Sequence, residues 1–203
     1  MGMELEFKLA VDDAALLERI LSDPQVTQLR TEPFRTYEMA TVYYDTPERA
    51  LKARKWTLRL RQENRLPVAT LKTPAVDRAR GEWSCEADSI VAAIPQLLAQ
   101  GAPAELAALT EGTALTPVCE ARFTRRAADL RMDDGTVCEL AGDLGLLMGG
   151  SKKQALCEVE LELKSGCADT VEAFAGELLR RFGLREESRS KFRRAAALEE
   201  ETK

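Results

Sequence analysis

Apolar and polar residues alternate along much of the chain, which is the pattern of strands buried on one face. In residues 3–10, Leu5, Phe7 and Leu9 would share one face of a strand, and charged residues would share the other. Further strands are predicted over residues 37–45, 55–63, 66–73, 81–88, 117–126, 127–132, 136–147 and 154–164. Because short turns join most of these segments, the sheet should be antiparallel.

Helical periodicity appears between the strands. Asp12 is expected to cap a short amphipathic helix that Pro24 ends, and Asp169 a longer helix with Gly183 just past its end. Residues 89–112 are rich in Ala and Leu and are interrupted by Pro and Gly, so they predict two short helices. The predicted fold class is α+β and mainly β, with the helices packed outside the sheet.

Carboxylates occupy one face of two predicted strands that come from opposite ends of the chain. Either face alone is typical of a solvated strand, but like charges lined up on adjacent strands repel one another. A divalent cation would neutralise such a cluster, and oxygen ligands without His or Cys favour Mg²⁺ or Mn²⁺. The candidate ligands are Glu4, Glu6, Glu158, Glu160 and Glu162, and Asp143 is either a further ligand or a residue beside a turn.

Basic side chains follow the same alternation on other strands. Arg59 and Arg61 point to one face, and Lys72 lies on the partner strand of the predicted hairpin. Arg122 and Arg125 come from a later strand. Arg binds phosphate oxygens bidentately, whereas Lys acts as a point charge. One such strand would indicate an exposed basic face, but strands of both signs together favour a sheet closed around a charged lumen that holds a polyphosphate and a metal ion.

Composition narrows the function classes. The 203 residues predict a single domain over 1–203, and a net charge of −5 disfavours general binding to nucleic acid or to an anionic membrane. The chain has no histidine, which excludes a Ser-His-Asp triad, a Cys-His pair and His-ligated metal sites. The five cysteines form no C-x-x-C pair and no signal peptide or membrane span is visible, so a reduced, cytoplasmic protein is expected.

The order of these motifs resembles the CYTH superfamily, the triphosphate tunnel metalloenzymes. The Glu-x-Glu-x-Lys pattern near the N-terminus is that family's signature. The other matching segments follow in order: Tyr44-Asp45-Thr46-Pro47, Leu58-Arg59-Leu60-Arg61, Thr70-Leu71-Lys72, Arg80-Gly81-Glu82-Trp83, Phe123-Thr124-Arg125, Glu139-x-Ala141-x-Asp143-x-Gly145, Glu158-x-Glu160-x-Glu162 and Ser190-Lys191. The resemblance therefore runs from residue 4 to about residue 194, which is nearly the whole chain.

This resemblance implies a closed eight-stranded antiparallel β-barrel, a tunnel that binds a triphosphate together with Mg²⁺ or Mn²⁺. By similarity, the metal side would consist of Glu4, Glu6, Asp143, Glu158 and Glu160. The substrate-binding side would consist of Lys8, Arg59, Arg61, Lys72, Arg125 and Lys191, with Glu82 orienting a basic partner.

The implied activity is metal-dependent hydrolysis of a triphosphate, with inorganic triphosphate as the leading substrate. Glu4, Glu6 and Lys8 are the candidate catalytic residues, and either Lys8 or a metal-ligating Glu could accept a proton. The alternatives are thiamine-triphosphatase or class IV adenylate cyclase activity, or a polyphosphate- or nucleotide-binding module without turnover. The carboxylate cluster argues against the last, because anion binding alone does not need it.

Overall fold

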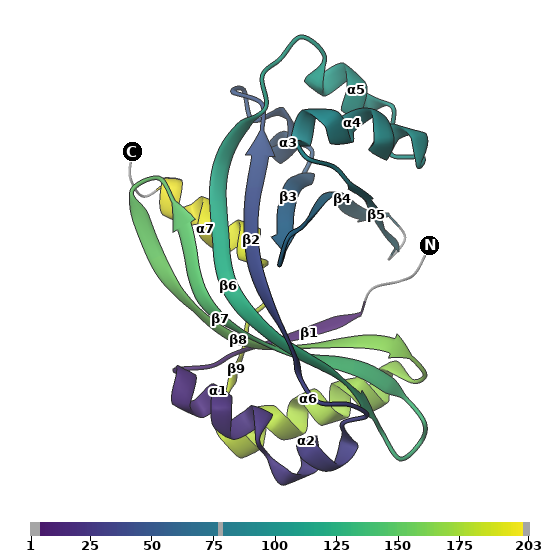
Figure 1. The fold of residues 1–203 in the computed structure, drawn as a ribbon, viewed down its shortest axis with the longest axis vertical. Coiled ribbons are helices and arrows are strands. Elements are labelled where there is room, and N and C mark those ends of the chain that lie inside the picture. Colours follow the sequence, from purple (N-terminus) through teal and green to yellow (C-terminus); the bar gives the residue numbers. More distant parts are fainter. Residues whose placement is uncertain (1–4, 77–78, 201–203) are drawn as a thin grey trace.

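The fold was analysed in a computed structural model, which describes residues 5–76 and 79–200. Over these residues one antiparallel sheet contains nine strands in the order β5-β4-β3-β2-β6-β7-β8-β1-β9 (Figure 1). The strands are β1 (Glu6–Ala10), β2 (Arg35–Asp45), β3 (Thr57–Glu63), β4 (Leu66–Val76), β5 (Ala79–Glu86), β6 (Thr116–Arg131), β7 (Val137–Gly149), β8 (Lys152–Ser165) and β9 (Arg185–Glu186). The helices are α1 (Ala14–Leu21), α2 (Pro24–Leu29), α3 (Ala50–Ala53), α4 (Ile90–Ala99), α5 (Glu105–Thr110), α6 (Ala168–Phe182) and α7 (Lys191–Glu200).

The mainly β, α+β class is confirmed, but closure of the barrel is not. Figure 1 shows the long strands β2, β6, β7 and β8 curving around one side of the molecule. In the described part of the chain, the hydrogen-bonded ladders end at β5 on one edge and at β9 on the other. The free edge of β1 pairs with β9 through Leu9 and Ala10, so this edge is not available there to β5. The result is a strongly curved sheet in place of the expected closed eight-stranded barrel.

Three apolar clusters attach the helices to the sheet. Helices α1, α2 and α6 pack against β1, β7 and β8, with Ile20 and Leu178 among the fully buried residues. Helices α4 and α5 cover β4 and β5 through Leu97 and Leu106. Helix α7 lies against β6 and β7, where Ala195 is fully buried. It packs on the inner face of the curved sheet, the face of Tyr43 and Arg125, so the expectation that the helices pack outside the sheet is wrong for α7. None of the described helices has the length and apolar character needed to cross a membrane.

Local differences from the sequence expectation have simple causes. The carboxylate that caps α1 belongs to Asp13, which accepts a hydrogen bond from the Leu16 amide, and not to Asp12. Pro24 begins α2, because a proline in the first turn of a helix gives up an amide that would be unpaired anyway. The two strands expected between residues 117 and 132 are one continuous strand, β6. This long strand reaches from α7 to the cluster around α1.

Candidate functional site

A cavity of about 320 Å³ lies inside the curve of the sheet, and eight strands and the start of α7 contribute to it. It is lined by Glu6, Lys8, Tyr43, Thr57, Arg59, Arg61, Lys72, Glu82, Arg125, Glu139, Ala141, Glu160, Glu162, Ser190, Lys191 and Phe192. Ten of the residues proposed from the sequence, Glu162 among them, therefore line one cavity. Asp143 and Glu158 are not in this lining but lie fully buried beside it. Glu4 lies outside the described residues.

The arginines of β3 form a cationic wall that is poorly compensated. Arg61 donates from Nε to Thr41 Oγ1 at 3.1 Å, and its Nη1 lies 3.5 Å from a Glu63 oxygen. Burial, and then the charge of Arg59, lower the pKa of Arg61 to about 10. The Nε of Arg59 is buried without a hydrogen-bond partner, and within residues 5–76 and 79–200 the guanidinium makes no ion pair. Two neighbouring cations thus face the cavity with little negative charge beside them.

Lys72 adds a third cation from the next strand and is held by a carboxylate. Lys72 and Glu82 are directly opposite one another on β4 and β5, and Lys72 Nζ lies 2.7 Å from Glu82 Oε2. Both side chains line the cavity. This geometry agrees with the expectation that Glu82 orients a basic partner.

The opposite side of the cavity carries carboxylates in one row across three strands. Glu6 on β1 pairs in register with Glu162 on β8, which pairs in register with Glu139 on β7. Burial, and then the nearby charge of Glu160, raise the pKa of Glu6 to about 7, although Lys8 Nζ lies only 3.1 Å from a Glu6 oxygen. Burial also raises the pKa of Glu139. Both shifts come first from burial, which disfavours the charged carboxylate, and neighbouring carboxylates add to them.

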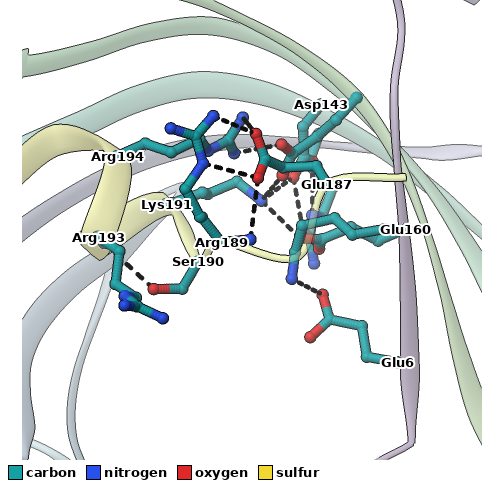
Figure 2. Close-up of polar contacts among 12 residues, drawn as sticks. Glu6, Asp143, Glu160, Glu187, Arg189, Ser190, Lys191, Arg193 and Arg194 are labelled. Atoms are coloured by element: carbon teal, nitrogen blue, oxygen red, sulfur yellow. Dashed lines mark hydrogen bonds and ion pairs between the residues drawn. The ribbon is translucent and has the colours of Figure 1, made fainter. Parts of the chain in front are cut away.

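A second group of charges is buried behind this row. Lys191, at the start of α7, extends its ammonium between Asp143, Glu158 and Glu160 (Figure 2). Its Nζ lies 2.7 Å from Asp143 Oδ2, 2.5 Å from Glu158 Oε1 and 2.8 Å from Glu160 Oε1. The three carboxylates hold the pKa of Lys191 above its ordinary value, although burial opposes this. We call Asp143, Glu158 and Glu160 the acidic trio.

Two arginines complete the charge balance of the acidic trio. Arg125 donates from Nε and Nη2 to the two oxygens of Asp143, both at 2.7 Å, and also contacts Glu160. Arg194, one helical turn after Lys191, contacts Glu158. Burial would raise the pKa of Glu160, but Lys191, Arg125 and Lys8 together hold it well below its ordinary value. Three buried carboxylates thus pair with Lys191, Arg125 and Arg194, and Lys8 Nζ lies 3.7 Å from Glu160 as a fourth cation.

The structure also separates the two arginines proposed from β6. Arg125 lines the cavity, whereas Arg122 is exposed and pairs with Glu120 on the outer surface. Sequence reasoning missed Arg194 altogether and did not place Glu139 in the cavity. Glu139 could have been found, because it lies four residues before Asp143 on the same strand and therefore points to the same face. Arg194 carries no local signal, because its partner Glu158 belongs to a distant strand.

The acidic trio and Glu6 have the donors that a hard divalent cation prefers. One carboxylate oxygen from each member of the trio lies within 4.8 Å of the others, and no soft ligand belongs to this group. Lys191 occupies the space between these oxygens. The donors therefore fit Mg²⁺ or Mn²⁺ chemically. In this structure the Lys191 ammonium lies between them and compensates part of their negative charge.

Comparisons with known proteins agree with this architecture. A family model described as CYTH domain matches residues 2–196. Among solved structures, a putative adenylyl cyclase from Hippeastrum, described as having a dominant triphosphatase activity, is 18% identical, with 98% of this chain and 96% of that chain covered and a TM-score of 0.58. A putative adenylate cyclase from Bacillus halodurans is 17% identical, with 94% and 96% covered and a TM-score of 0.59. A protein from Pyrococcus horikoshii is 21% identical, with 93% and 96% covered and a TM-score of 0.53.

Proposed function

The chain belongs to the CYTH domain family, and on this premise we propose that it hydrolyses a triphosphate, inorganic triphosphate first of all, with the help of Mg²⁺ or Mn²⁺. One triphosphate-binding domain would span residues 1–203. The proposal agrees with the triphosphatase activity named for the Hippeastrum relative. The argument from this chain itself rests on the charges that line its cavity.

The observation that carries the proposal is that the cavity has two oppositely charged sides, each only partly compensated by ion pairs among the described residues. Arg59 and Arg61 face it from β3 with little compensation, and Glu6 and Glu139 face it from the other side with raised pKa values. A lone anion would be repelled by the carboxylates, and a lone cation by the arginines. A polyphosphate that carries a divalent cation complements both sides at once.

The roles of the cationic side follow from its chemistry. Arg59 and Arg61 would bind terminal phosphate oxygens, and Lys72, held by Glu82, would add a positioned point charge. Arg125 and Lys191 would contribute further positive charge at the border with the acidic trio. Holding the phosphates in place and neutralising the charge that develops on them lowers the barrier for attack by water.

The metal side would consist of Glu4, Glu6, Asp143, Glu158 and Glu160. A divalent ion held there supplies Lewis-acid polarisation of phosphate oxygens and lowers the pKa of a nearby water. Either Lys8 or a metal-ligating Glu such as Glu6 would accept the proton from the attacking water. Lys8 lies between Glu6 and Glu160 and would orient both carboxylates.

The alternatives find less support in the cavity. A cyclase or a thiamine-triphosphatase must also hold an aromatic group of its substrate. The aromatic rings that line the cavity, those of Tyr43 and Phe192, pack on each other with centroids 5.1 Å apart. Because each ring already has an aromatic partner, neither is assigned to a ring of the substrate. A binding module without turnover would not need the acidic row opposite the arginines.

The test is a comparison of substrates. Phosphate release would be measured with inorganic triphosphate, ATP and thiamine triphosphate, each with Mg²⁺ or Mn²⁺ and each with excess chelator. We expect the highest kcat/KM with inorganic triphosphate and no turnover with chelator. Formation of cyclic AMP and pyrophosphate from ATP, or the absence of turnover with all three substrates, would overturn the proposal.

A matched pair of variants on β6 adds a control to this assay. Arg125→Met removes a cation that lines the cavity, and we expect kcat/KM to fall at least a hundredfold. Arg122→Met removes the same group from the exposed outer surface and should leave kcat/KM within twofold. Equal effects of the two substitutions would indicate that the cavity is not the site of the reaction.

A further inference from the structure

Lys191 occupies the place that a metal ion bound by the acidic trio would take. Its Nζ lies within hydrogen-bond distance of one oxygen from each of the three carboxylates. Asp143 and Glu158 are fully buried and Glu160 is nearly so, and Lys191 itself is only 7% exposed. A divalent ion would sit about 2.0–2.6 Å from such oxygens, so it and the ammonium cannot both lie between them.

Among the cations that contact the trio within hydrogen-bond distance, Lys191 is the one best placed to be displaced by a metal ion. Arg125 makes two parallel hydrogen bonds to Asp143 from a rigid strand, and this bidentate geometry resists displacement. Arg194 contacts Glu158 and is not among the residues that line the cavity. Lys191 combines a flexible four-carbon stem with a position on the cavity wall.

The backbone of α7 has little freedom to follow such a movement. A Cβ atom at Gly149 would lie 2.2 Å from the Ala195 carbonyl oxygen, so helix and strand are in very close contact there. Ala195 is fully buried, and Phe192 packs against Tyr43. Arg49 also holds the far end of the helix through Glu199, at 2.5 Å. The side chain of Lys191 can therefore turn while the helix stays in place.

We propose that Lys191 is an internal counter-ion that exchanges with the divalent cation. Without metal its ammonium neutralises the acidic trio. When a metal ion binds the trio, the ammonium is released into the cavity, on the side where Arg59 and Arg61 face phosphate. Metal binding thereby adds a positive charge to the anion site, and the two ligands bind cooperatively. This inference rests on the metal-binding part of the proposed function.

The experiment measures binding of Mn²⁺ alone, without phosphate, by electron paramagnetic resonance. Lys191→Met removes the competing ammonium, and we expect Mn²⁺ to bind at least tenfold more tightly than to the unmodified protein. Arg194→Met removes an equal charge from beside one member of the trio, Glu158, but leaves Lys191 in place. It should tighten binding by less than threefold. Circular dichroism checks that each variant is folded, and Lys191→Gln replaces Lys191→Met if the latter does not fold.

A second titration tests the coupling. In the unmodified protein, Mn²⁺ should tighten the binding of a non-hydrolysable imido analogue of triphosphate by at least tenfold more than it does in Lys191→Met. Equal Mn²⁺ affinities for the unmodified protein and Lys191→Met, or equal effects of the two single substitutions, would overturn the exchange while leaving the triphosphatase proposal intact. If no form of the protein bound Mn²⁺, the metal dependence of the proposed function would fail as well.

Discussion

The cationic wall of β3 and the network around Lys191 border the same cavity but differ in how their charges are paired. In the network, four cations surround three carboxylates, and over residues 5–76 and 79–200 only Lys191 contacts all three. On the wall, Arg59 has an unpaired buried Nε and Arg61 has a pKa lowered to about 10. In the paired region every charged group has an ion-pair partner, although Arg194 Nε is buried without a hydrogen bond. The unpaired region lacks negative charge that a ligand would supply.

This difference links the paired region mainly to stability and the unpaired region mainly to ligand binding. Breaking a buried ion pair leaves a charge without compensation and is strongly destabilising. Two arginines held side by side with little negative charge beside them repel each other, so the wall costs stability until an anion lies against it. We therefore attribute the wall to ligand binding. The network around Lys191 holds the neighbouring side chains in position when no ligand is bound.

The largest expected effect comes from breaking the paired region. Glu158→Ala leaves Lys191 and Arg194 buried with one carboxylate fewer, and should lower the free energy of unfolding by about 3–5 kcal/mol. Urea denaturation of the metal-free protein measures this. The matched change in the unpaired region, Arg59→Met, should leave stability unchanged or raise it slightly. A comparable loss in both variants would contradict the distinction between the two regions.

The next effect concerns activity and tests the unpaired region. Arg59→Met should lower kcat/KM for inorganic triphosphate by about ten- to a hundredfold, because a charge-assisted hydrogen bond contributes roughly 1.5–3 kcal/mol. The loss should be similar for ATP, since the contact is with phosphate. If Arg59→Met left triphosphate hydrolysis unchanged but abolished turnover of one organic triphosphate, this arginine would not bind phosphate.

The smallest effect is the pH dependence that the acidic row gives to the metal-free protein. Glu6 has a pKa of about 7 in the fold, above its ordinary value of 4.5, so folding favours its protonated form. The stabilisation is fully present below about pH 4.5 and is lost as the pH rises to about 7. Thermal melts should therefore show a melting temperature that falls by a few degrees over this interval because of Glu6.

Substitution isolates this contribution. Glu6→Gln should remove that part of the slope, whereas Glu172→Gln, on the exposed face of α6, should keep it. An unchanged slope in Glu6→Gln would show that another group causes the pH dependence.

Much of the candidate site could be predicted from strand parity. Alternation on β3 placed Arg59 and Arg61 on one face, and both line the cavity. The same rule was insufficient where neighbours in space decide the outcome. Asp143 and Glu160 both face inward from neighbouring strands, yet Glu160 lines the cavity and Asp143 lies behind Lys191. The alternation of residues defines a face, but not how deep along that face a side chain is buried.

The sequence pattern also could not predict which strands pair at the edges of the sheet. Each strand shows its two faces in its residues, but nothing in a strand states which neighbour occupies its free edge. β9 has only two residues, too few for a periodic signal, yet it pairs with β1. The expected closed barrel therefore became, over the described residues, a curved sheet with two edges.

By itself, the sequence determined the strands, the face to which each charged side chain points and the family resemblance, because these follow from local periodicity and from the order of motifs. Only the tertiary structure decided which charges are paired. The ammonium of Lys191 meets Asp143, Glu158 and Glu160 because the start of α7 is held against β7 and β8. Ion pairing depends on distances of a few ångströms between residues far apart in the chain, and the packing of α7 on the sheet sets those distances.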